Sequence, residues 1–87
     1  MRVSYYSVYD KKSLVFGQVF PAPTPGAAER MIEQTVNTPG DNLICKYPED
    51  FALYYCFTFD DSVGELCSSE DEIVPRLVVE AVALVRS

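Results

Sequence analysis

The three cysteines are the side chains of this sequence that most readily suggest a chemical role. Cys45, Cys56 and Cys67 are spaced eleven residues apart, which matches no paired CxxC zinc pattern, and an odd number cannot form a closed disulfide framework. The chain contains no histidine, so the usual metal ligand and the usual general base near neutral pH are absent. We therefore expect reduced thiols, with Cys56 behaving as a small hydrophobic residue inside an apolar run.

Grouped carboxylates are the second feature that could support chemistry, either acid–base catalysis or cation binding. They occur at 49–50, 60–61 and 70–72, where each group flanks a turn or the end of an element and serves local hydrogen bonding. The segment DDSVGEL lacks the alternating ligands and distant glutamate of an EF-hand loop. Ser68, Ser69 and Cys67 have no histidine or lysine partner, and isolated glycines exclude a P-loop. We expect a protein that is not an enzyme and that has no metal or cofactor.

Size and composition limit the organisation of the chain. Its 87 residues are enough for one domain with one core, and 48% of them are hydrophobic, including six tyrosines and five phenylalanines. No apolar run approaches the roughly 18 to 20 residues of a membrane span, and the N-terminus lacks the pattern of a secretory signal. The sequence therefore predicts a single cytoplasmic domain over residues 1–87 with no membrane association.

The formal net charge of −6 is unevenly distributed along the chain. Residues 1–48 contain five basic and four acidic side chains, so the acidity belongs to the last 39 residues. An acidic balance disfavours nonspecific nucleic-acid binding, which requires clustered Lys and Arg to neutralise phosphates. A local basic site remains compatible with this balance.

The N-terminal third has the pattern of an antiparallel hairpin. Residues 2–9 alternate in a way that predicts a strand with two faces, one carrying Val3, Tyr5, Ser7 and Tyr9 and the other Arg2, Ser4, Tyr6 and Val8. A polar break at 10–12 precedes a second strand over 13–20, in which Gly17 indicates a bulge or a close backbone approach. Pro21 and Pro23 are expected to stop the sheet because neither can donate a ladder hydrogen bond.

One main helix and one central strand follow. Thr24 and Pro25 are typical of a helix start, the apolar stripe Ala28, Met31, Ile32, Thr35 and Val36 has helical spacing, and residues 37–40 end the helix. Residues 51–59 give the strongest strand signal, with Phe51, Leu53, Tyr55, Phe57 and Phe59 expected on one face and both faces buried. A five-residue turn over 60–64, with Gly64 at positive φ, leads to a short return strand over 65–67.

The C-terminal segment permits two interpretations. We prefer a short helix that begins at Pro75 and continues to about Val85, although the valine-rich composition of 77–85 makes a strand a serious alternative. The predicted fold class is therefore α+β. A small antiparallel sheet, made of the hairpin, the central aromatic strand and the return strand, packs against one main helix, and a short C-terminal helix completes the fold.

Aromatic residues interleaved with basic ones are the feature most compatible with nucleic acid. Tyr5, Tyr6 and Tyr9 lie near Arg2, Lys11 and Lys12, and single-stranded DNA sites commonly combine a stacking face with a positive groove. The alternative is that these tyrosines pack the core or pair across the hairpin.

Several stretches together resemble the small non-structural protein of gokushoviruses, which are single-stranded DNA microviruses of bacteria. The matching segments are YSVYDKK at 6–12, FPAPTPGAAERMIEQTVN at 20–37 and KYPEDFALYYCFTFDDSVGEL at 46–66, the last being the most specific. The resemblance implies a phage accessory protein, often catalogued as DNA-binding, made in the host bacterial cytoplasm. It implies a role around single-stranded genome synthesis or packaging.

Two hypotheses for function follow. In the first, the protein binds single-stranded DNA through Arg2, Tyr6, Lys11 and Lys12, together with Arg30 or Lys46. In the alternative, the acidic C-terminal half, with Glu70, Asp71 and Glu72, docks onto a basic phage or host protein. An exposed strand edge also allows a homodimer.

Overall fold

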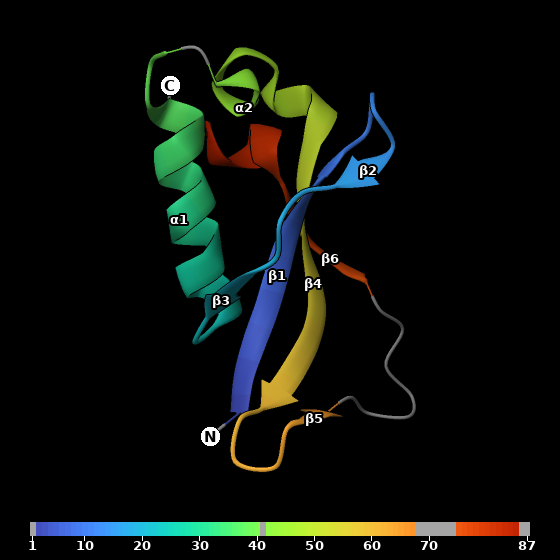
Figure 1. Ribbon diagram of the computed structural model, residues 1–87. Helices are drawn as coiled ribbons and strands as arrows, with labels where there is room; N and C mark the ends of the chain where they lie inside the picture. The colour runs from blue at the N-terminus through green and yellow to red at the C-terminus, as the bar shows by residue number, and fades with distance from the viewer. Residues whose placement is uncertain (1, 41, 68–74, 86–87) are drawn as a thin grey trace.

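Two long antiparallel strands form the centre of the structure (Figure 1). The computed structural model describes residues 2–40, 42–67 and 75–85, and in these residues six strands form one antiparallel sheet. β1 (Arg2–Asp10) pairs along its whole length with β4 (Phe51–Asp60). The short strands β2 (Val15–Phe16) and β3 (Phe20–Ala22) pair with the other edge of β1, and β5 (Glu65–Cys67) and β6 (Arg76–Glu80) pair with the other edge of β4. The α+β class and the central position of β4 are confirmed.

The main helix, α1 (Pro25–Asn37), begins and ends where the sequence indicates. Thr24 is its N-cap, with the Thr24 Oγ1 accepting a 3.1 Å hydrogen bond from the Ala27 backbone N–H, and Pro25 occupies the first turn. Ala28, Ile32 and Val36 are buried, as predicted for the apolar stripe, whereas Met31 is exposed. The shortest helical segments are α2 (Leu43–Lys46), η1 (Pro48–Asp50) and η2 (Ala81–Leu84).

The helices lie on one face of the sheet, which we call the inner face; the opposite one is the outer face. α1 packs against β3, β4 and β6, and η2 lies between α1 and the sheet (Figure 1). Tyr6, Leu53 and Tyr55 from the inner face pack with Ile32 and Val36 of α1 in a single core. Burial of these side chains, at about 1.5–3 kcal/mol each, is the main stabilising term of the fold.

A β-bulge in β4 changes which phenylalanines face the core. The pairing of β1 with β4 shifts between Tyr5, which is opposite Phe57, and Tyr6, which is opposite Tyr55, so that Cys56 is the additional residue. The alternation predicted for β1 is confirmed. The prediction that one face of β4 carries all five apolar residues is wrong beyond Tyr55, because the bulge moves Phe57 and Phe59 to the outer face.

The C-terminal segment differs from the preferred prediction. Arg76–Glu80 forms strand β6, which pairs with β4, and the short C-terminal helix begins only at Ala81. The alternative of a strand is therefore correct for the first half of the segment. The edge of β4 is available for pairing, and the β-branched Val78 and Val79 of β6 pack against the core.

The proline-rich connection also differs from its prediction. Pro21 does not stop the sheet but lies within β3, opposite Tyr5 of β1. An edge strand tolerates proline because the outward side of its backbone makes no ladder hydrogen bond. Before β3, Gly17 approaches β1 closely: its N–H donates to the Val8 carbonyl at 2.9 Å, and its carbonyl accepts from the Ser7 hydroxyl at 2.8 Å. No helix within the described residues is long and apolar enough to cross a membrane.

Candidate functional site

Most of the aromatic side chains outside the core lie on the outer face of the sheet. α1 does not cover this face. Residues directly opposite each other in an antiparallel pair share a face, so the pairing of β1 with its neighbours defines the members of this surface. Besides Ser7, Pro21, Ala52 and Glu80, they are the larger apolar side chains Val3, Tyr5, Tyr9, Phe16, Tyr54, Phe57, Phe59, Leu66 and Leu77. Six of these nine are tyrosine or phenylalanine residues, and five of the six, from three different strands, make ring contacts with another member.

These rings form two groups along the outer face. Tyr5 and Phe57 stack with ring centroids 4.9 Å apart and an interplanar angle of 18°. Tyr9, Phe16 and Tyr54 form the second group, with centroids 4.7 Å apart for Tyr9 and Phe16 and 5.5 Å apart for Phe16 and Tyr54. Ser7 lies between the groups and is fully buried. The outer face therefore presents two half-buried aromatic groups on a rigid sheet.

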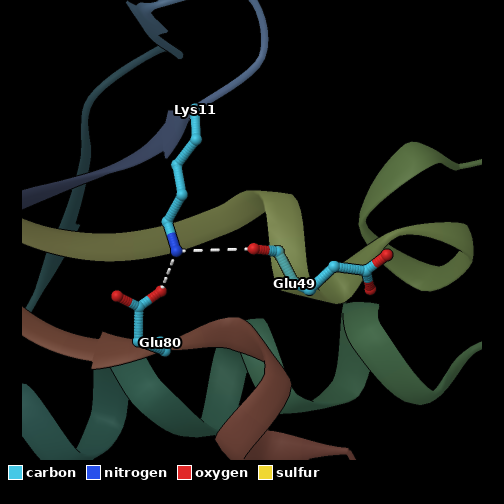
Figure 2. A network of polar contacts seen from close by, with 3 residues as sticks. All are labelled: Lys11, Glu49 and Glu80. Carbon is cyan, nitrogen blue, oxygen red and sulfur yellow. Dashed lines mark hydrogen bonds and ion pairs between the residues drawn. The ribbon is translucent and has the colours of Figure 1, made fainter.

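One ion pair crosses the outer face at the end of the second aromatic group. Lys11 Nζ lies 2.5 Å from Glu80 Oε2 and 3.4 Å from the Glu49 carbonyl oxygen, as Figure 2 shows. Glu80 is opposite Ala52, which is opposite Tyr9, so the contact spans β4 on this face. Lys11 thus joins the β1–β2 turn to the C-terminal strand. Its charge is compensated by a carboxylate, which weakens its suitability as a phosphate ligand.

The remaining predicted basic residues come from separate elements of the fold. Arg2 begins β1 and Lys12 follows its far end, about 30 Å away at about 3.3 Å per residue. Arg30 is exposed on α1, which covers the inner face, and Lys46 is exposed at the end of α2. The structure therefore does not bring the predicted cations together into one positive groove.

The predicted stacking residue Tyr6 faces the wrong way for that role. Its side chain is only 2% exposed and packs in the core against Tyr55, with ring centroids 5.6 Å apart. Burial raises the pKa of the Tyr6 hydroxyl, and the neighbouring Tyr55 adds to the effect. The Tyr6 ring therefore has no exposed face on which a base could stack. Its neighbours Tyr5 and Tyr9 occupy the outer face, and the sequence could not tell which of the two faces α1 would cover.

A concave surface lies beside the β1–β2 turn. This cleft has a volume of about 260 Å³ and is lined by Asp10, Lys12, Ser13, Leu43, Tyr47, Asp50 and Phe51. The Asp10 carboxylate accepts hydrogen bonds from the Lys12 and Ser13 backbone N–H groups and from the Ser13 hydroxyl. These contacts stabilise the turn, so Asp10 has a local structural role in this cleft.

The described thiols and acidic side chains are the other groups that the sequence offered for chemistry. Cys45 and Cys56 are free thiols, and burial raises the pKa of the Cys56 thiol, which lowers its thiolate content. Within the described ranges, no group of three or more His, Cys, Asp or Glu side chains is arranged to hold a metal ion. The alternative partner-binding residues Glu70, Asp71 and Glu72 lie outside the described residues.

Comparison with known proteins places the chain in a family. The family model described as Phage ORF5 protein matches residues 3–84. Protein ORF5 of Chlamydia phage 1 is 34% identical over 77 residues, which cover 85% of this chain and 80% of the relative. No solved structure matches the chain. Chlamydia phage 1 is a gokushovirus, so the resemblance noted in the sequence is confirmed, and the chain belongs to the phage ORF5 protein family.

Proposed function

We propose that this phage accessory protein binds single-stranded DNA by stacking bases on the outer face of its sheet. The observation that carries the proposal is the pair of uncovered aromatic groups, Tyr5 with Phe57 and Tyr9 with Phe16 and Tyr54. Sheets that bind single strands use aromatic side chains in this way, because unpaired bases expose their π-faces whereas duplex bases do not. The site in this proposal differs from the hairpin cluster expected from the sequence.

The spacing of the two groups suits a strand that lies along β1. Tyr5 and Tyr9 are four residues apart, which corresponds to about 13 Å along the strand. One stacked base contributes about 1–3 kcal/mol by alanine substitution, so two stacked bases supply about 2–6 kcal/mol. Stacking therefore provides the larger part of the affinity, and phosphate contacts have a secondary role.

The dispersed cations predict an unusually weak dependence on salt. With Lys12 and one further cation at phosphates, the slope of log affinity against log salt is about −1.4 for a single strand. Affinity then falls only about sevenfold between 50 and 200 mM salt. Binding driven by many phosphate contacts would instead fall by orders of magnitude over this range.

Fluorescence anisotropy of a labelled single-stranded oligonucleotide tests the proposal, with a duplex of the same sequence for comparison. Phe57→Leu keeps apolar volume on the outer face but removes one π-face, so we expect the dissociation constant to rise by about 5- to 100-fold. Met31→Leu is the control because Met31 is exposed on α1, on the other side of the sheet from the outer face. Equal affinities of the Phe57→Leu and wild-type proteins, or no binding of the wild type at about 50 mM salt, would refute the proposal.

A second candidate is an acidic protein-interaction module without DNA contact. The net charge of −6 and the separation of Arg2 from Lys12 favour a basic protein partner over a polyanion. Reversing Glu70, Asp71 and Glu72 to lysine tests this candidate through co-purification from infected cells. Loss of a specific phage or host protein, with DNA affinity absent throughout, would support the second candidate over the first.

A further inference from the structure

The outer face contains exposed aliphatic side chains that base stacking does not explain. Leu66 on β5 is 67% exposed and Leu77 on β6 is 48% exposed, and they lie opposite Phe59 and Tyr54 respectively. Phe16, on the opposite side of the sheet, is 43% exposed. Apolar groups therefore extend across the whole width of the outer face. In soluble proteins, large exposed apolar patches commonly mark surfaces that bind another molecule.

The dimensions of the outer face match those of a protein interface. The six strands contain 32 residues, each of which covers about 3.3 Å along its strand and about 4.8 Å across it, so the sheet outline is about 500 Å² before side-chain relief is counted. A stable interface buries about 800 Å² on each partner. Because side chains add accessible area to a flat outline, the outer face is large enough to form such an interface.

The charge distribution selects a second copy of this chain as the occupant. Two copies with a net charge of −6 repel each other, so association requires a surface without net charge. Among the described residues of the outer face, the ionised side chains are Lys11 and Glu80, which neutralise each other in their ion pair. Two outer faces can therefore meet without bringing like charges together, and a highly basic partner would find no net negative charge there.

We propose that two copies of the protein associate through their outer faces in a two-fold symmetric dimer. The two sheets pack about 10 Å apart, as in a β-sandwich, with Leu66 and Leu77 inside the interface. This dimer does not require that the protein binds DNA. If both proposals hold, a single strand and the second copy compete for Tyr5 and Phe57, so the dimer is a storage form that DNA dissociates.

Analytical ultracentrifugation of the full chain at about 1–200 μM tests the dimer. We expect the wild type to sediment as a dimer at the upper concentrations and the Leu66→Glu/Leu77→Glu variant to require at least tenfold more protein for dimerisation. Both positions are exposed, so the substitutions leave the core intact, which circular dichroism verifies. Met31→Glu introduces one glutamate, where the double variant introduces two, at an exposed position of α1. It should dimerise like the wild type after correction for its one added charge.

Two outcomes would overturn the dimer: a wild type that is monomeric at 200 μM, or a double variant that dimerises as strongly as Met31→Glu. Titration with an oligothymidylate then tests the competition. Conversion to one protein chain per bound oligonucleotide supports a shared face, whereas binding to an intact dimer contradicts it. A dimer that binds no oligonucleotide would leave this inference standing and refute the proposed function, so the two failures are distinguishable.

Discussion

The ion pair between Lys11 and Glu80 allows a quantitative test of the structure. At the 2.5 Å separation of Nζ and Oε2, the Coulomb attraction in a water-like medium is about 1.7 kcal/mol. The two side chains are 41% and 40% exposed, so the pair is solvated, and holding a long lysine in one geometry offsets about half of this attraction. We therefore expect a coupling free energy of about 0.5–1 kcal/mol.

A double-mutant cycle with Lys11→Met and Glu80→Gln measures this coupling through urea unfolding of the two single variants and the double variant. Raising the ionic strength from about 0.05 to 1 M should reduce the coupling substantially, because the screening length falls to about 3 Å. Lys12→Met in place of Lys11→Met is the control, with no coupling to Glu80 expected. A coupling below about 0.2 kcal/mol at low salt would show that the pair does not form, and one above about 2 kcal/mol would contradict its solvent exposure.

Two further predictions concern the turn between β4 and β5. Gly64 has φ of +71°, so Gly64→Ala should lower the free energy of unfolding by about 1–2 kcal/mol in urea denaturation. The control Gly26→Ala in α1 should leave the free energy of unfolding equal or slightly higher. Equal losses in the two variants would refute the assigned conformations. Hydrogen bonds from the Ser62 side chain and backbone N–H lower the pKa of Asp60. The stability that these bonds contribute is present above about pH 4 and is lost as the pH falls through the lowered pKa. Ser62→Ala should therefore reduce stability at pH 6 more than at pH 2, and an equal reduction at both pH values in urea titrations would contradict this linkage.

Local sequence signals account for the elements that were predicted correctly. Thr24 and Pro25 define the start of α1 through capping and a fixed φ, and Gly64 supplies the positive φ that the β4–β5 turn requires. The alternation of β1 is also local, because its residues follow a regular two-residue period. These features depend on a few neighbouring residues, which is why the sequence alone predicts them.

Long-range pairing accounts for the features that were not predicted. The bulge at Cys56 depends on how β1 pairs with β4, and the composition of β4 is apolar on both sides of it. Strand β6 forms because β4 has an edge to pair with, although its valine-rich sequence also permits a helix. The Lys11–Glu80 contact joins residues 69 positions apart. The same limitation explains the exchange of Tyr6 for Tyr5 and Tyr9 in the candidate site.

Pro21 in the edge strand β3 has a consequence for behaviour at high concentration. Strand edges with a complete row of backbone donors recruit further strands and can grow into open-ended fibrils. β3 lacks one of these donors, and β6 carries an irregularity at Val78 on the opposite edge of the sheet. β3 and β6 are thus poor templates for strand addition. Open-ended polymerisation through these two strands is therefore disfavoured at high concentration, although the chain is rich in apolar strands.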